Sequence, residues 1–206
     1  MKSKINTMKV VNGLRILYTV LFVVSIVGTV LCLLCGVLFT AMDSLGVWED
    51  PEIVSMIGDF SDLGIPLDFG ALDLFMYGAA IAAIGTTVLH FFSKRFFKFV
   101  LEVDDIFDRT AIVKMQTLGI LHLVIPFVCN FISGIFAGAF LAAGGLDVET
   151  SPSLEGPYFV LGLVYILLTF IFSYAADLKE ENARLTAQKN EAPVEPTADT
   201  DPTLAE

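Results

Sequence analysis

The sequence predicts an all-α integral membrane protein whose four transmembrane helices form an up-down bundle. Hydrophobic residues make up 55% of the chain and charged residues only 17%, against about 25% charged residues in a typical soluble domain. The apolar residues also come in long blocks, whereas the half-buried elements of a soluble core alternate apolar with polar residues. The 12 Lys and Arg residues are confined to three of the stretches outside these blocks.

The first apolar block sets the direction of the chain. Residues 16–42 contain no Asp, Glu, Lys or Arg. A helix rises about 1.5 Å per residue, so this block is long enough to cross a hydrocarbon core about 30 Å thick. It is also longer than the apolar region of a secretory signal, which has about 7–15 residues. We therefore expect a retained first span at about 16–42.

Three further charge-free blocks are each long enough to span a membrane. They cover residues 74–93, 115–146 and 156–176. None shows strand alternation, and inside lipid an open chain satisfies its own backbone hydrogen bonds only as a helix. We expect transmembrane helices at about 72–93, 115–143 and 157–176, which with the first span form one membrane domain of residues 1–189.

The placement of charge predicts the orientation of the chain. All Lys and Arg residues lie in the N-terminal segment, in the connection after the second block and in the segment after the fourth. The loops 43–73 and 147–155 carry acidic charges only. Because basic residues are held on the cytoplasmic side, we expect both termini to be cytoplasmic. No dense basic stripe is present to neutralise phosphates, so direct binding of nucleic acid is not expected.

The first outer loop, residues 43–73, is long for a hairpin connection. Asp50, Pro51 and Glu52 match the N-cap, the first-turn proline and the first-turn acid of a helix, which predicts a short surface helix at about 51–60. Alternatively, the carboxylates of this loop could ligate a hard cation. The spacing of a calcium loop with its fixed glycine is absent, so we favour a solvated acidic loop and expect no metal.

The connection between the second and third spans predicts an amphipathic helix at about 92–109. Apolar residues at helical spacing, among them Phe92, Phe96 and Phe99, fall on one stripe, and charged residues occupy the opposite side. One interpretation is a helix that links two spans at the level of the lipid headgroups. The other is a docking surface for a cytoplasmic partner, formed by Lys94, Arg95, Lys98, Glu102, Asp105 and Arg109.

The third predicted span holds most of the polar and small residues at membrane depth. Pro126 has no N–H and is expected to kink the helix. The functional interpretation is a polar seam with a hinge, suited to a permeation path or a ligand pocket. The structural interpretation, which we favour, is a packing face whose small residues let a second helix approach closely. The set comprises His122, Pro126, Cys129, Asn130, Ser133, Gly134 and Gly138.

The sequence offers little support for catalysis. No span contains Asp or Glu at depth, and neither a zinc-protease motif nor a phosphate-binding loop is present. His90 and His122 supply too few ligands for a metal site. Cys32 and Cys35 have the spacing of a redox motif, but their apolar surroundings favour small packing residues over reactive thiols. We expect a non-enzymatic protein without a cofactor.

The last part of the chain divides into two segments. Residues 177–189 are charged and compatible with a helix. Residues 190–206 combine Pro, Thr and Ala with acids, and they contain too little apolar surface to offset chain entropy. We expect a disordered acidic cytoplasmic tail at 190–206.

Several short motifs resemble those of a known family. They are the acidic outer loop, the basic turn at 94–98, Phe107-Asp108-Arg109-Thr110 ahead of Gly119, and the segment 175–182 that continues the fourth span. With these features the chain resembles the bacterial four-span membrane family catalogued as domain of unknown function 2975. The resemblance implies a bacterial cytoplasmic-membrane protein. It also implies relatives that are often encoded beside small helix-turn-helix regulators.

Two functional hypotheses follow. The first is a non-enzymatic membrane regulator or sensor with a cytoplasmic protein partner, such as a helix-turn-helix regulator. The alternative is a small transporter or channel subunit, acting as a homo-oligomer, that uses the polar seam on the third span. We favour the first because it requires nothing unusual of the spans.

Overall fold

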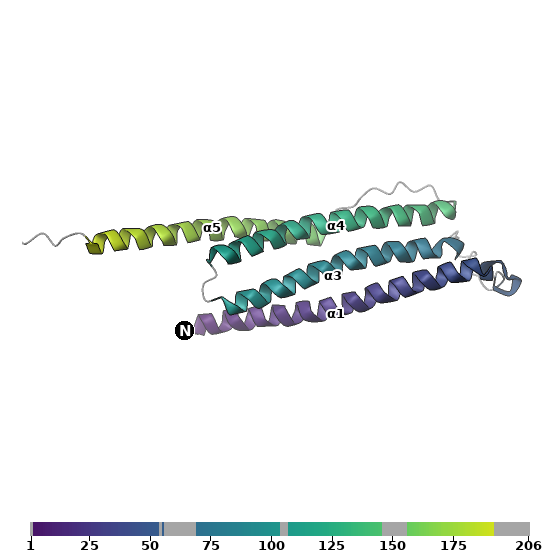
Figure 1. The fold of residues 1–206 in the computed structure, drawn as a ribbon, viewed down its shortest axis with the longest axis horizontal. Helices are drawn as coiled ribbons and strands as arrows, with labels where there is room; N and C mark the ends of the chain where they lie inside the picture. Colours follow the sequence, from purple (N-terminus) through teal and green to yellow (C-terminus); the bar gives the residue numbers. More distant parts are fainter. Residues whose placement is uncertain (1, 54, 56–68, 104–106, 146–155, 192–206) are drawn as a thin grey trace, which may run out of the picture.

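The computed structural model describes residues 2–53, 55, 69–103, 107–145 and 156–191. Two short 3-10 helices lie in it, η1 (Val47–Glu49) after α1 and η2 (Phe69–Ala71) before α3. No strand occurs among the described residues, as the all-α prediction requires (Figure 1). Most of this part of the chain forms four long helices: α1 (Lys2–Ser44), α3 (Leu72–Glu102), α4 (Arg109–Ala143) and α5 (Gly156–Glu191).

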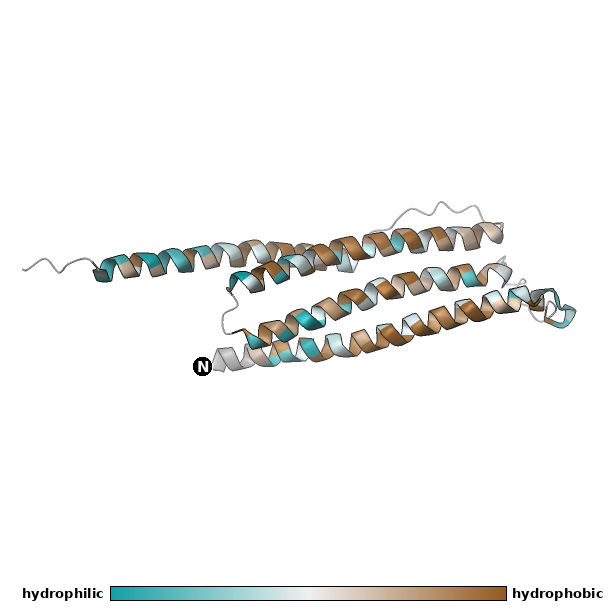
Figure 2. Cartoon of the chain, viewed as in Figure 1, coloured by the Kyte–Doolittle hydropathy of each residue, from teal (hydrophilic) through white to brown (hydrophobic). Residues whose placement is uncertain are grey.

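All four long helices are long and apolar enough to cross a membrane. Each of the four predicted spans lies inside one of them. Apolar residues dominate the middle of the assembly, whereas hydrophilic residues gather toward the end that carries the N-terminus and along the outer part of α5 (Figure 2). The structure therefore confirms the prediction of four helices able to span a membrane.

The helices pack mainly against their neighbours in the chain. α1 packs on α3, α3 on α4 and α4 on α5, and successive helices run in opposite directions (Figure 1). α5 is shifted along α4. The shift is evident at Arg109, the first residue of α4, which pairs with Asp177, well before the C-terminal end of α5. As a result, the part of α5 after Asp177 extends past the N-terminal end of α4 (Figure 1).

Glycines set the closest approaches between these helices. A Cβ atom built on Gly119 of α4 would lie 3.1 Å from the carbonyl oxygen of Gly162 in α5, and one on Gly162 would lie 3.0 Å from that of Gly119. A Cβ atom on Gly36 of α1 would come within 2.8 Å of the Tyr77 ring. Small residues let membrane helices approach at such distances.

The connection between α3 and α4 differs from the predicted helix at 92–109. α3 covers the first part of that range and ends at Glu102, after which Val103 is extended. Asp108 is also extended and caps α4, since its side chain accepts a hydrogen bond from the N–H of Thr110. Phe92, Phe96 and Phe99 of the apolar stripe therefore belong to α3, which stops before the predicted end of the helix. Residues 104–106 lie outside the described part.

Two other predictions are only partly covered by the structure. Residues 51–53 and 55 are helical, and the rest of the predicted surface helix at 51–60 lies outside the described residues. α5 continues through 177–189 and reaches Glu191, so the first two residues of the predicted disordered tail are helical. Residues 192–206 lie outside the described part.

Little of the apolar surface is buried within the chain itself. A small core contains Met115, Leu118 and Tyr165, with partly buried residues such as Phe96 packed against it. On α1, by contrast, side chains such as Val24 and Leu34 are 62% exposed. Apolar faces of this extent suit a lipid environment, where the hydrocarbon chains replace a protein core.

Candidate functional site

One face of the predicted seam packs directly on α3. A Cβ atom on Gly85 would lie 2.6 Å from Sγ of Cys129, and one on Gly78 would lie 3.5 Å from Oγ of Ser133. Further along the same face, the rings of Phe140 and Phe75 have centroids 5.7 Å apart. At these positions α3 and this face of α4 are in close contact. They favour the structural interpretation of the seam.

The adjacent small stripe of α4 makes looser contacts. Asn130, Gly134 and Gly138 are half-buried, and a Cβ atom on Gly134 would meet nothing within 4 Å in the described structure. α4 remains helical through Pro126. The close glycine contact of α4 lies instead at Gly119, which the predicted seam did not include.

The structure brings together a layer of buried and half-buried polar side chains, of which the sequence singled out only His90 and His122. We call Tyr18, Ser25, His90, Ser93, His122 and Tyr165 the polar layer. Oγ of Ser25 lies 2.9 Å from Nδ1 of His90, which ties α1 to α3. The His122 and Tyr165 rings have centroids 5.4 Å apart and tie α4 to α5. All four long helices therefore contribute to this layer.

Hydrogen bonding fixes part of the chemistry of the polar layer. His122 is 1% exposed, and its Nδ1 lies 2.8 Å from the carbonyl oxygen of Leu118. A carbonyl only accepts, so Nδ1 carries the proton and Nε2 of a neutral ring remains an acceptor. The Ser93 hydroxyl is fully buried and has no hydrogen-bond partner in the described structure. Two histidines do not make a metal site, and the described residues contain no group of three or more metal-ligating side chains.

Both histidines could have been paired from the sequence by their depth. His90 lies one turn before Lys94, where the second apolar block ends, and His122 lies two turns after Lys114, where the third begins. In antiparallel helices, residues at similar depth from the same boundary are neighbours. A comparison of depth would have indicated that both histidines lie in one layer, which the pattern of each helix alone does not show.

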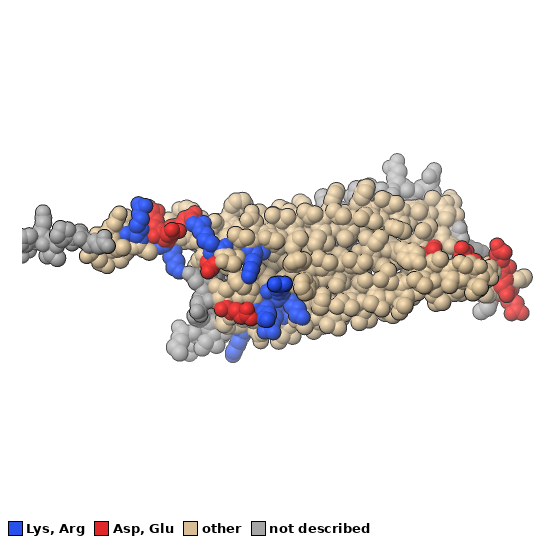
Figure 3. Space-filling model, in the orientation of Figure 1, with Lys and Arg blue, Asp and Glu red and all other residues tan. Residues whose placement is uncertain are grey.

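Four of the six residues predicted as a docking surface line a cleft at the basic end of the molecule. This basic cleft has a volume of about 660 Å³ and lies between α1, α3 and α4. Lys and Arg side chains gather at one end of the face shown in Figure 3, and Asp and Glu alone mark the other end. The charged residues that line the cleft are Arg15, Lys94, Arg95, Lys98, Glu102 and Lys114.

Aromatic rings position two of the cleft lysines. Nζ of Lys114 lies 3.2 Å from the centroid of the Phe99 ring, so a side chain of α4 lies over a ring of α3. Nζ of Lys94 lies 5.3 Å from the centroid of the Phe22 ring on α1. Cations near the face of an aromatic ring are attracted by its quadrupole. These contacts hold the ammonium groups close to apolar surface.

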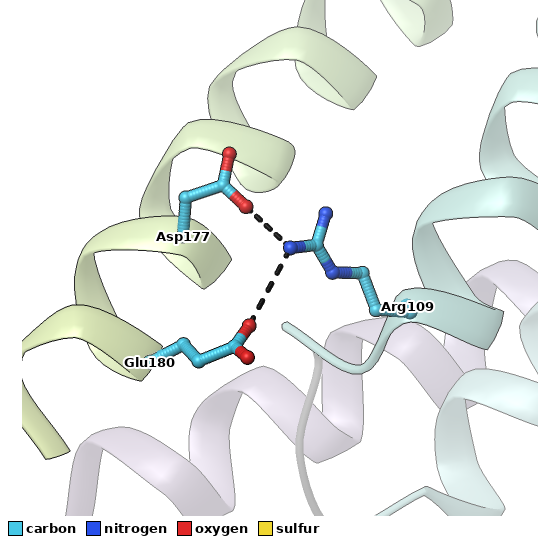
Figure 4. A network of polar contacts seen from close by, with 3 residues as sticks. All are labelled: Arg109, Asp177 and Glu180. Atoms are coloured by element: carbon cyan, nitrogen blue, oxygen red, sulfur yellow. Dashed lines mark hydrogen bonds and ion pairs between the residues drawn. The ribbon is translucent and has the colours of Figure 1, made fainter. Parts of the chain in front are cut away.

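The two remaining docking residues lie elsewhere. Arg109 forms ion pairs with Asp177 and, at 3.6 Å, with Glu180 on α5 (Figure 4). The side chains of all three are more than half exposed, so these ion pairs contribute little to stability. They lie at the point where α5 begins to extend beyond the other helices. Asp105 lies outside the described residues.

Over the described residues, the fold and the charges define a class: a helical protein with four helices able to cross a membrane and, on the face shown in Figure 3, Lys and Arg side chains gathered at one end. Comparison with protein-family models, with curated proteins and with solved structures finds no match for this chain. The resemblance to the four-span family accordingly stays a prediction.

Proposed function

We propose that this protein is a non-enzymatic regulator or sensor of the bacterial cytoplasmic membrane and that the projecting end of α5 binds a cytoplasmic partner. The observation that carries the proposal is the exposure of this end. Every side chain from 177 to 190 is exposed, although these residues are helical. Apart from the ion pairs of Asp177 and Glu180 with Arg109, the described structure shows this charged helical segment with its side chains exposed, which suits it to binding another molecule.

The proposed helix surface has apolar as well as charged residues. Leu178 and Leu185 are 42% and 51% exposed and lie seven positions apart, so they share one face of the helix. Leucines at this spacing are the contacts by which amphipathic helices bind one another. By resemblance, the partner is a small helix-turn-helix regulator.

Charge supports the cytoplasmic position of this surface. All Lys and Arg residues lie in the N-terminal segment, the 94–114 region and the segment after residue 176. The basic residues of a multi-pass protein mark its cytoplasmic side. The projecting end of α5 lies on the same side as the N-terminus, as Figure 1 shows.

Labelling tests this orientation. In a variant with Cys32, Cys35 and Cys129 replaced by alanine, Leu45→Cys or Lys98→Cys supplies the only thiol. A membrane-impermeant maleimide on intact cells should label Leu45→Cys, and it should label Lys98→Cys only after permeabilisation. The reverse pattern would place α5 outside and overturn the proposal.

Site-specific photo-crosslinking tests the partner. A photoreactive amino acid at Glu181 of the full-length protein in its own membrane should capture one discrete soluble protein. Leu178→Glu with Leu185→Glu should abolish that product, because both changes put charge on the proposed contact face. Arg184→Gln with Lys189→Gln alters the same helix and should retain it. No product at Glu181, or one insensitive to the leucine changes, would contradict the proposal.

The alternative function, a small transporter or channel subunit, rests on the seam of α4. The packing of Cys129 and Ser133 against glycines of α3 favours a structural role for that face. Replacing His122 and Asn130 by leucine in a protein that still folds provides the test. Loss of a solute flux in that variant would favour transport, and an unchanged flux would leave the regulator as the proposal.

A further inference from the structure

The basic cleft has the features of a lipid site. We infer that its cations bind the phosphate headgroup of an anionic phospholipid, whose acyl chains lie along the apolar surface of α1, α3 and α4. Three observations support this inference: the position of the cations, their lack of carboxylate partners and the apolar lining beside them. None of these observations requires a protein partner, so the inference goes beyond the proposed function.

The cations lie where the apolar part of each helix ends. Arg15 immediately precedes the charge-free block 16–42 of α1. Lys94 immediately follows the block of α3, and Lys114 immediately precedes that of α4. Three helices thus place a cation in one cleft at the boundary of their apolar regions. In a bilayer, this boundary is the level of the headgroup phosphates.

The positive charge of the cleft is not balanced within the described structure. Five cations line it, and the only described carboxylate there is Glu102, whose Oε1 lies 3.7 Å from Nζ of Lys98. Arg15, Lys94, Arg95 and Lys114 form no ion pair with a described carboxylate. Held together by three helices, these groups form a preorganised site for an anion, and Arg and Lys are the residues that bind phosphate oxygens.

The rest of the lining is apolar, which distinguishes a lipid from a soluble anion. Phe91 and Phe92 are both exposed, on the side of the cleft toward the middle of α3. A phosphate ion would leave this surface in contact with water, whereas a phospholipid covers it with acyl chains. The volume of about 660 Å³ is within the range of about 300–1,000 Å³ found for small-molecule pockets. The apolar lining comprises Phe91, Phe92, Phe96, Phe99, Leu118 and Leu121.

Calorimetric titration of the full-length protein in nonionic detergent micelles tests the site. The probes are dioctanoyl phosphatidylglycerol, dioctanoyl phosphatidylcholine and inorganic phosphate. Phosphatidylglycerol should bind with saturation, and phosphatidylcholine should bind at least about tenfold more weakly because its choline repels the cations. Arg95→Gln with Lys114→Gln should weaken binding of phosphatidylglycerol about tenfold or more.

Two further variants control for folding and for total charge. Arg95→Lys with Lys114→Arg keeps the charge of the cleft and should retain most of the affinity. Arg184→Gln with Lys189→Gln removes the same charge from α5 and should leave the affinity unchanged. The inference is overturned if both lipids bind equally or if the glutamine changes in the cleft have no effect. Inorganic phosphate that displaces phosphatidylglycerol at equal concentration would also overturn it, because the site would then bind a soluble anion.

Discussion

The two halves of α4 differ in burial, although both are apolar. Before Pro126, the described helix buries Ala111, Ile112, Met115, Leu118, Gly119 and His122, and after it only Phe140 is buried. α5 explains the difference, because its close contacts with α4 lie at Gly119, His122 and Leu123. Burial in this molecule therefore follows the overlap between helices and not the polarity of each residue.

The comparison predicts that an added methyl group lowers the free energy of unfolding in the first half of α4 only. Gly119→Ala should have the largest effect, since its Cβ atom would lie 2.9 Å from Cγ1 of Ile166 and 3.1 Å from the Gly162 carbonyl oxygen. We expect a loss of about 1–3 kcal/mol in the free energy of unfolding, measured in mixed micelles by titration with sodium dodecyl sulfate. Gly134→Ala, where a Cβ atom meets nothing within 4 Å, is the matched control. Equal losses in both variants would refute the comparison.

A second prediction concerns the polar residues of the two halves. His122→Leu removes a fully buried ring that contacts Tyr165, and it should cost about 1 kcal/mol in the same titration. Asn130→Leu changes a half-buried side chain in the second half and should be neutral or slightly stabilising. If Asn130→Leu proved the more damaging change, the important polar contact would lie in the second half, and the comparison would be wrong.

The smallest expected effect lies at the very start of α4. Arg109→Gln removes the ion pairs with Asp177 and Glu180, which are largely exposed, and it should cost about 0.5 kcal/mol or less. Amide hydrogen exchange near Asp177 should nevertheless become faster, because the cross-link between the two helices is lost. Lys189→Gln, on the projecting part of α5, should leave that exchange unchanged. A large loss of stability in Arg109→Gln would mean that these ion pairs are more than a surface link.

The sequence alone predicted the helices better than their contacts. The length of an apolar block depends on the local sequence alone, so the charge-free blocks located all four helices. The end of α3 at Glu102 was not found, because the apolar stripe at helical spacing continues across the break. The cap at Asp108, followed by the start of α4, was present in the sequence but was interpreted as part of one long helix.

The candidate sites show the same limit. Helical spacing places Cys129 and Ser133 on one face of α4, and both lie against glycines of α3, whereas His122 contacts Tyr165 of α5. Which helix covers that face depends on the relative shift of two segments, which spacing within one segment does not specify. Arg15 and Lys114 therefore went unnoticed as partners of Lys94 in the basic cleft, although each borders its own apolar block.

The neighbour-to-neighbour packing of the helices has a consequence for biosynthesis. Because α1 packs on α3, α3 on α4 and α4 on α5, each helix finds its main partner in the one made just before it. Docking can thus proceed in the order of translation, because each new helix meets a partner that has already been made. During synthesis, an early helix therefore need not stay unpacked in the translocon until a later helix has been made.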